Sequence, residues 1–288
     1  MPILANKIDC TGCAACMNSC ARSAIQMVAD EEGFLVPIVN KDKCVECKLC
    51  EKSCPVITKT SNTNTSQPKA YAVWNNIDRR VSSSGGAFSS FARYVLKKGG
   101  AVFGAAFDSN LHCHHIKVTT IEGLDALRGS KYVQSEIVNT YKEVKNVLKN
   151  DKYVLFCGTP CQVAGLKAYL RKDYEKLITL DLACHGVPSD SVFQAYKSKI
   201  STRFAGFGNV DGFEFRRRDG WGKAPSLLTV NSARFMMLTH YSCALSIKVH
   251  CSESVVIIVL MQIVIGLEIV RWLIFGDWVG MAYLSSTM

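Results

Sequence analysis

No long apolar segment opens the sequence, and this absence is the first constraint on the class of protein. Residues Met1–Lys7 run directly into charged sequence, whereas a secretory signal needs an uninterrupted apolar core. Without such a leader, the 14 cysteines among the 288 residues are not expected to form the disulfide framework of a secreted domain. We therefore expect a reducing, cytoplasmic setting in which the cysteines bind metal or take part in redox chemistry.

The sequence also lacks a stripe of Lys and Arg interleaved with aromatic residues, so we expect no nucleic acid partner. The formal net charge of +10 arises in residues 61–231, with 24 basic and 14 acidic groups, whereas residues 1–60 have seven of each and 232–288 three of each. This excess suits an anionic cofactor or an acidic partner, and a solvated surface explains it equally well. With 48% apolar and 20% charged residues, the chain is neither disordered nor collagen-like.

Eight cysteines fall in two runs of the same spacing within residues 1–60. The runs are Cys10-x2-Cys13-x2-Cys16-x3-Cys20 and Cys44-x2-Cys47-x2-Cys50-x3-Cys54-Pro55. In two-cluster ferredoxins the fourth cysteine of each run binds the other cluster. We therefore assign one 4Fe–4S cluster to Cys10, Cys13, Cys16 and Cys54, and the other to Cys44, Cys47, Cys50 and Cys20. Zinc is the alternative, because paired C-x2-C motifs also bind zinc.

The remaining chain divides into a linker, a second domain and a tail. Residues 61–70 are polar and include Pro68, which favours a linker after a dicluster domain at 1–60. In 71–231, apolar strands alternate with amphipathic helices, which is typical of an α/β domain. We expect strands at 71–74, 101–107, 153–156 and 177–182, and helices after 86, through 138–148 and at 163–170. Ligands of such sheets bind where the strands end.

Several motifs of 71–231 together resemble the coenzyme F420 hydrogenase/dehydrogenase beta-subunit family, in its bacterial type with an N-terminal dicluster ferredoxin. They are Ser82–Gly86, Gly99–Asp108, Lys131–Ser135, Gly158–Gln162 and Cys184–Ser189. The resemblance implies an α+β ferredoxin-like dicluster domain followed by an α/β flavin-binding domain. It further implies that FAD exchanges a hydride with a deazaflavin or another organic partner, and exchanges electrons with the clusters.

The same resemblance implies roles for individual residues. Ser83, Ser84, Gly85 and Gly86 would lie near the cofactor, while Lys131 and Gln134 would lie near its ring or near the substrate. His185 is a candidate proton donor, or a histidine held in a tight turn. Cys157, Cys161 and Cys184 are candidate ligands of a third cluster, or buried free thiols. The group His112-Cys113-His114-His115 looks like a metal site, but we expect surface histidines at the end of a strand.

Two functions remain open. The chain is predicted to be an iron–sulfur flavoprotein oxidoreductase that passes electrons between 4Fe–4S clusters and a flavin, a deazaflavin or an organic substrate. Alternatively, it is an electron-transfer subunit that serves a partner enzyme and has no substrate of its own. Either function needs a redox partner protein or a small electron carrier. A zinc-stabilised interaction module is a third, more distant alternative.

The tail at 232–288 departs from the family. Residues 255–275 form an apolar run long enough to cross a membrane, although Glu268 and Arg271 interrupt it. The family instead ends in a soluble segment with a C-x2-C pair and a later A-D-F/I-W-G motif. In a shifted reading frame, residues 253–262 and 272–281 are compatible with both elements. We therefore favour a frameshift between about residues 230 and 251 over a genuine membrane anchor. Sequencing the gene tests this hypothesis, which is wrong if only the frame translated here encodes an intact family member.

Overall fold

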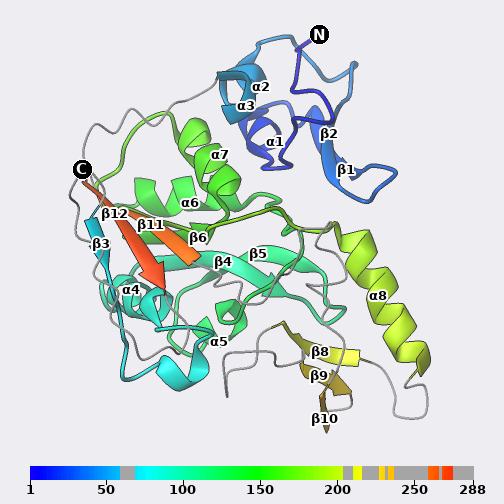
Figure 1. The fold of residues 1–288 in the computed structure, drawn as a ribbon. Helices are drawn as coiled ribbons and strands as arrows, with labels where there is room; N and C mark the ends of the chain where they lie inside the picture. The colour runs from blue at the N-terminus through cyan, green and yellow to red at the C-terminus, as the bar shows by residue number, and fades with distance from the viewer. Residues whose placement is uncertain are drawn as a thin grey trace, which may run out of the picture.

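The structure is a computed structural model that describes residues 1–58, 69–203 and 210–215, together with strands at 227–230, 233–236, 259–265 and 268–274. Residues 59–68, most of the expected linker, lie outside the described residues, as does most of the tail. Figure 1 shows a small N-terminal domain lying against one face of a larger α/β domain. This arrangement agrees with the mixed α+β and α/β architecture expected from the sequence.

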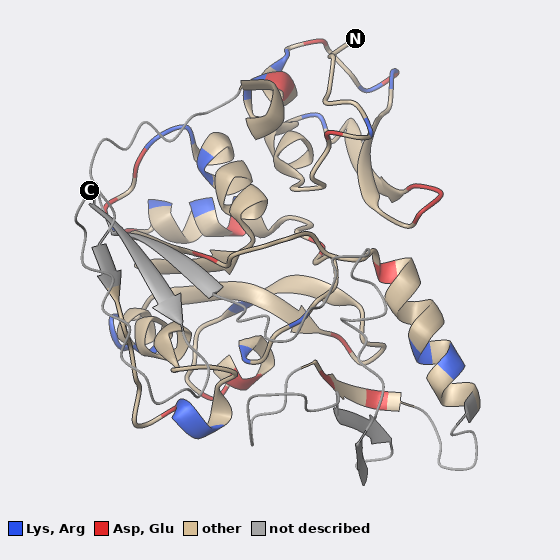
Figure 2. Cartoon of the chain, in the orientation of Figure 1, with Lys and Arg blue, Asp and Glu red and all other residues tan. Residues whose placement is uncertain are grey.

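The N-terminal domain consists of short helices around the two cysteine runs and a two-stranded hairpin. The hairpin pairs β1 with β2 antiparallel, and Ile25 lies opposite Val39. Its acidic tip is visible in Figure 2, where the charged residues are coloured along the backbone. The elements of this domain are α1 (Ala15–Ser19), β1 (Ile25–Ala29), β2 (Leu35–Val39), α2 (Leu49–Lys52) and α3 (Pro55–Thr58).

A seven-stranded sheet forms the centre of the α/β domain, in the order β3-β12-β11-β7-β6-β4-β5. Strands β4, β6 and β7 pair parallel, and β5 pairs antiparallel with β4 at the edge. Helix α7 makes the crossover from β6 to β7, whereas β5, α5 and α6 lie between β4 and β6. Their apolar runs are buried on both faces. The bounds are β3 (Lys69–Tyr71), β4 (Ala101–Phe107), β5 (Cys113–Val118), β6 (Val154–Gly158), β7 (Leu177–Asp181), β11 (Val259–Ile265) and β12 (Glu268–Ile274).

Alternation along the strands builds a separate core on each face of the sheet. Phe103 and Phe156 face α6 and α7, in a core that also contains Ala14 and Ala15 of the N-terminal domain. Their neighbours in sequence face α4 instead, in a second core. The N-terminal domain is therefore part of the core on one face. The helices and the 3-10 turn of the domain are η1 (Arg79–Val81), α4 (Ala87–Lys97), α5 (Leu124–Leu127), α6 (Thr140–Lys149), α7 (Pro160–Leu170) and α8 (Asp190–Arg203).

Two boundaries differ from those expected. The first strand of the α/β domain ends at Tyr71 rather than Trp74, because the chain then turns and the Asn75 amide donates to the carbonyl of Gly85. Helix α7 begins at Pro160, three residues earlier than expected. The Thr159 amide donates to Gln162 Oε1 at 3.0 Å, so this side chain caps the helix from its first turn.

A second, three-stranded sheet follows α8 in the order β10-β9-β8. Phe107, at the end of β4, packs with Phe193 of α8 and Phe215 in an aromatic cluster that joins this sheet to the main one. The bounds are β8 (Val210–Glu214), β9 (Leu227–Val230) and β10 (Ala233–Met236).

The apolar run at 255–275 contains two strands rather than a helix. Strands β11 and β12 pair antiparallel, and β11 adds to the edge of β7. Among the helices that the structure describes, none is both long and apolar enough to cross a bilayer. The frameshift hypothesis for 232–288 stays a prediction.

The expectation of surface histidines at 112–115 is wrong for His115, which is buried in β5. Its ring stacks on Phe156 with the centroids 5.3 Å apart. Nε2 lies 3.1 Å from the carbonyl oxygen of Cys157, which only accepts, so Nε2 carries the proton and Nδ1 accepts from the Ser135 hydroxyl at 2.8 Å. Burial lowers the pKa of His115 to about 4, so the ring is neutral at pH 7.

We expect acid to destabilise the protein through His115. An unfolded histidine takes up a proton near pH 6.5 that the folded ring accepts only near pH 4, so folding stability falls as the pH drops through this window. The loss between pH 7.5 and 5.5 is about 1 kcal/mol, measured as the free energy of unfolding in urea. His115→Gln should flatten this slope, whereas His114→Gln on the same strand should keep it. Equal slopes in all three proteins would contradict the assignment.

Candidate functional site

The two cysteine runs form matching turns 34 residues apart. Ala14, after the second cysteine of the first run, has φ 57° and ψ 15°, and Lys48, at the same place in the second run, has φ 57° and ψ 14°. Gly12 and Glu46, between the first and second cysteines, also have positive φ, at 66° and 52°. In each turn a left-handed residue precedes a short helix that carries the third cysteine. The repeat in sequence is therefore a repeat in backbone conformation.

Cysteines of both runs line a single enclosed space. Cys10, Cys13 and Cys16 of the first run meet Cys54 of the second run around it. Apolar side chains complete its wall, including Leu4, Met27, Pro37 and Val56. The four cysteines assigned to one cluster from the sequence thus lie around the same space, and their role as its ligands stays a prediction. Four sulfurs in an apolar enclosure suit a 4Fe–4S cluster, whose ligands are thiolates.

Burial holds the thiols of Cys10, Cys13 and Cys16 in their protonated form when no metal is bound. It raises the pKa of Cys13 to about 11 and that of Cys16 to about 12, and it also raises the pKa of Cys10. Backbone amides oppose this effect, since those of Gly12 and Ala15 donate to the sulfurs of Cys10 and Cys13. These amides point at the atoms that bear negative charge in a cluster.

The second set of cysteines lies further out. Cys47 is exposed, whereas Cys13, at the equivalent position of the first run, is buried. Cys50 is buried, burial raises its pKa, and Cys20 of the first run is one of the neighbours that adds to this shift. The amide of Ala24 donates to the Cys20 sulfur at 3.2 Å. Cys20 of the first run therefore lies near Cys50 of the second, and its assignment as a ligand of the second cluster stays a prediction.

The first turn packs directly on helix α7 of the α/β domain. An added Cβ on Gly165 would lie 3.1 Å from the sulfur of Cys13, which is tighter than ordinary van der Waals contact, so glycine favours this close approach. Polar contacts surround it: the Asn18 side chain donates to the carbonyl of Val138 at 2.9 Å, and Arg171 donates to the Ser53 hydroxyl at 3.0 Å. The first set therefore faces the α/β domain.

Gln134 lies at this domain boundary rather than deep in the α/β domain. Its Oε1 accepts the Leu35 amide at 3.0 Å, and its own backbone amide donates to the carbonyl of Pro188. The Ser189 hydroxyl donates to the carbonyl of Glu32 at 2.6 Å. The motifs Lys131–Ser135 and Cys184–Ser189 thus both take part in holding the N-terminal domain.

The three candidate ligands of a third cluster have different surroundings. Cys161 lies in the first turn of α7, where its neighbours include Cys10 and Cys13. Cys157 is at the end of β6, where burial raises its pKa to about 12, and Cys184 is exposed. Among the residues that the structure describes, the two cysteine runs included, no three His, Cys, Asp or Glu side chains are placed to hold one metal ion, whereas a 4Fe–4S cluster binds each of its four cysteines at a different iron. The third cluster stays a prediction.

Ser83–Gly86 forms a loop over the start of helix α4. The side-chain oxygens of Ser83 and Ser84 are buried and have no hydrogen-bond partner. The structure explains why both positions are glycine. A Cβ on Gly85 would clash with the carbonyl oxygen of Val73, and Gly86 has a φ of 88°, which other residues rarely adopt. Two buried hydroxyls without partners are unusual in a folded protein and mark a place where a polar ligand would fit.

Lys131 lines an open pocket between the loop after α5 and strand β8. Its ammonium donates to the carbonyl oxygens of Arg128 at 3.0 Å and of Gly129 at 3.3 Å. The pocket combines aromatic, basic and acidic side chains, namely Phe107, Phe213, Phe215, Arg128, Lys131, Asp108, Asp211 and Glu214. His185 is exposed in the turn after β7 and does not line this pocket.

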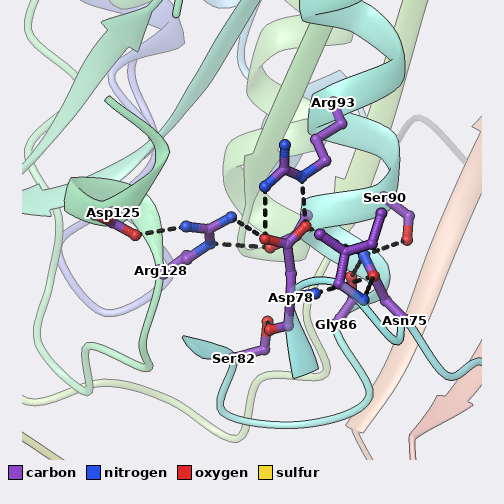
Figure 3. A network of polar contacts seen from close by, with 10 residues as sticks. Asn75, Asp78, Ser82, Gly86, Ser90, Arg93, Asp125 and Arg128 are labelled. Atoms are coloured by element: carbon purple, nitrogen blue, oxygen red, sulfur yellow. Dashed lines mark hydrogen bonds and ion pairs between the residues drawn. The ribbon is translucent and has the colours of Figure 1, made fainter. Parts of the chain in front are cut away.

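A buried ionic network beneath the serine loop was not anticipated from the sequence (Figure 3). Asp78 is 2% exposed and pairs with Arg93 at 2.5 Å and with Arg128 at 2.7 Å. Hydrogen bonding from Arg93 is the largest cause that lowers the pKa of Asp78. Arg128 also contacts Asp125 and the hydroxyl of Ser89, so one carboxylate ties the loop, α4 and the end of α5 together.

Two protein families match the chain. Residues 9–57 match the 4Fe-4S dicluster domain, and residues 151–251 match the family that describes the C-terminal part of the coenzyme F420 hydrogenase/dehydrogenase beta subunit. Together the two matches span just over half of the chain. They confirm the resemblance expected from the sequence, and with it the presence of an iron–sulfur dicluster domain.

Two individual proteins also match part of the chain. An uncharacterized polyferredoxin-like protein of Methanocaldococcus jannaschii is 31% identical over 68 residues, which cover 21% of this chain and 40% of that protein. A chain in a structure of the F420-reducing NiFe hydrogenase complex from Methanosarcina barkeri shares 18% identity, with a TM-score of 0.42, over 59% of this chain and 62% of that one. The chain covers less than two thirds of either protein.

Replacing Asp78 should destabilise the α/β domain strongly. Asp78→Asn leaves the buried guanidinium of Arg128 and the partly buried one of Arg93 facing an uncharged amide, and we expect a loss of about 3 kcal/mol or more in the free energy of unfolding. Asp125→Asn is the matched control, because the Asp125 side chain is 69% exposed and its pair with Arg128 is worth less than about 1 kcal/mol. Urea unfolding measures both, and similar losses would contradict the central role of Asp78.

Proposed function

We propose that this chain, which joins a 4Fe-4S dicluster domain to the C-terminal region of the coenzyme F420 hydrogenase/dehydrogenase beta-subunit family, is an iron–sulfur flavoprotein oxidoreductase. Electrons would pass between an external carrier, the two clusters, a flavin and an organic substrate. The observation that carries this proposal is the seating of the first cysteine turn on helix α7. A cluster held there is next to the domain in which the organic chemistry would occur.

The two clusters would have different positions in the electron path. Cys10, Cys13, Cys16 and Cys54 would bind the inner cluster, because they line one enclosure beside the α/β domain. The outer cluster would use the second set, Cys44, Cys47, Cys50 and Cys20, of which Cys47 is exposed. An electron carrier would reach the outer cluster most easily, and the inner cluster would pass electrons onward.

A flavin would be held in the α/β domain by the serine loop Ser83–Gly86 and by the pocket beside Lys131. The buried hydroxyls of Ser83 and Ser84 would hydrogen-bond polar groups of the cofactor, next to Gly85 and Gly86. When bound, FAD would exchange single electrons with the clusters and a hydride with a deazaflavin or another organic partner, and this hydride transfer is the chemistry that the clusters alone do not provide. The residue types present fit such a group. The unpartnered serine hydroxyls would hydrogen-bond its polar parts, and the aromatic side chains of the nearby pocket would pack against its ring.

The pocket beside Lys131 is our candidate site for the ring or the substrate. Lys131 and Arg128 supply positive charge there, and Phe107 and Phe215 supply apolar walls. Backbone carbonyls fix the Lys131 ammonium at the pocket edge, where it would orient an anionic group. His185 would donate a proton only to a partner bound on the exposed turn after β7.

An electron-transfer subunit without its own substrate is the second candidate function. The exposure of Cys47 favours it, because a relay needs one cluster near the surface and one near the partner domain. In this case the redox partner, rather than the chain, would perform the organic chemistry. The presence or absence of bound flavin separates the two functions.

We expect the purified chain, handled without oxygen, to contain about eight iron atoms, about eight sulfides and bound flavin. Iron, acid-labile sulfide and flavin assays measure these contents, and the absorption spectrum checks them. Iron near twelve would add the third cluster. Iron without flavin would favour the relay function, and zinc in place of iron would contradict both.

Single cysteine variants test the crossed ligand sets. Cys54→Ser should impair the cluster that also uses Cys10, Cys13 and Cys16, although Cys54 belongs to the second run. Cys161→Ser, a neighbour of Cys10 and Cys13, should leave the iron content of the two clusters unchanged if only the eight cysteines of the two runs bind iron. The two resolved cluster signals in electron paramagnetic resonance (EPR) spectra report which cluster is affected in each variant.

A further inference from the structure

We propose that Gln134 is a positioning residue for the inner cluster, through which the α/β domain holds the turn that carries Cys10 and Cys13. This inference rests on the proposed function, because it requires the two clusters to be bound. It assigns Gln134 to the iron–sulfur end of the electron path, rather than to the flavin ring or the substrate.

The orientation of the Gln134 side chain follows from its contacts. The Leu35 amide can only donate, and it lies 3.0 Å from Oε1, so the oxygen faces β2. The Nε2 group is therefore the end that reaches the cysteine turn. A Cβ built on Gly12 would lie 2.5 Å from Nε2 and 2.9 Å from the carbonyl oxygen of Leu35. The side chain thus fills the space directly above Gly12.

Comparison of the two repeats shows that this space is specific to the first turn. Gly12 and Glu46 occupy equivalent positions, and both have positive φ. The second turn accepts a large side chain there, because Glu46 is exposed and pairs with the N-terminal ammonium at 2.6 Å. The first turn has glycine where Gln134 approaches. The backbone conformation alone therefore does not require glycine, whereas the close approach of Gln134 and of the Leu35 carbonyl oxygen does.

The position of Gln134 gives it an electrostatic role. The amide of Gly12 donates to the sulfur of Cys10, so Gln134 contacts the residue that supplies a hydrogen bond to a ligand of the inner cluster. Hydrogen bonds to cluster sulfurs, nearby charge and solvent exposure set the reduction potential of such clusters. Gln134 would affect the inner cluster far more than the outer one, because the outer turn lies on the side of the domain that contains exposed Cys47.

The Gln134→Glu variant tests whether Gln134 lies beside the inner cluster. The carboxylate still accepts the Leu35 amide, so the side chain stays in place while a negative charge is added beside the inner cluster. Reduction adds an electron to the cluster, so the new charge should lower its potential. We expect at least about a tenfold change in the reduction equilibrium of the inner cluster, which is about 59 mV for one electron, and a smaller change for the outer one.

The experiment is an anaerobic redox titration of the full iron-loaded chain, followed by EPR. Cys47→Ser alters the outer cluster and identifies its signal. Gln26→Glu is the matched control, because Gln26 is exposed on β1 of the same domain and undergoes the same chemical change. It should move neither potential by a comparable amount.

The outcomes separate this inference from the proposed function. A selective shift of the inner potential in Gln134→Glu supports the positioning role, as does a variant that loads only the outer cluster. Equal shifts of both potentials, or shifts as large in Gln26→Glu, would overturn it. Failure of the unsubstituted chain to bind iron would instead contradict the proposed function.

Discussion

The burial of the first cysteine turn against helix α7 is the contact on which the rest of the arrangement depends. Cys13, Ala14 and Ala15 belong to the same apolar core as Phe103 and Phe156 of the central sheet. Separating the two domains would therefore expose core surface, at about 25 cal/mol for each Å² of apolar area. The dicluster domain is consequently a fixed part of the molecule, and its inner cysteine enclosure has a defined distance from the sheet.

This docking breaks the symmetry of an internally repeated domain. The two turns have the same backbone conformation, yet Ala14 and Gly12 of the first turn are replaced by Lys48 and Glu46 in the second. Small residues occupy the positions that face the α/β domain, and charged residues occupy the equivalent positions that face solvent. If both clusters bind as proposed, this difference orders them along a path: the outer cluster would be accessible to carriers, and the inner cluster would be accessible to the α/β domain.

The sequence predicts local structure well here and long-range contacts poorly. Apolar periodicity predicts the strand at Ala101–Phe107 and the helix after Gly86, because both depend on neighbouring residues. The burial of His115 and the pairing of Asp78 with Arg128, 50 residues away, depend on how the strands and helices come together. No periodic pattern marks such residues. One signal was available, since the sequence Thr159-Pro160-Cys161-Gln162 has the spacing of a helix cap and would have placed the start of α7 correctly.

The candidate site also combines features that the sequence predicts with contacts that only the fold shows. Spacing alone predicts which cysteines meet, because cluster geometry imposes the motif, and the enclosure around Cys10, Cys13, Cys16 and Cys54 has this composition. The position of Gln134 was not predictable, because its contact with Leu35 joins residues 99 positions apart in different domains. The resemblance to a family indicated that the Lys131–Ser135 motif matters, but only the fold shows that part of it faces the iron–sulfur domain.

Hydrogen exchange of the full chain, with and without iron, tests the docking of the inner cluster most directly. If the first turn is seated on α7 through a bound cluster, removing the iron should speed amide exchange in α1, in the first half of α7 and around Gln134. Helix α4, on the opposite face of the sheet, should keep its protection. An unchanged α7 alongside faster exchange in α2 and α3, or an equal increase in α4, would contradict the account.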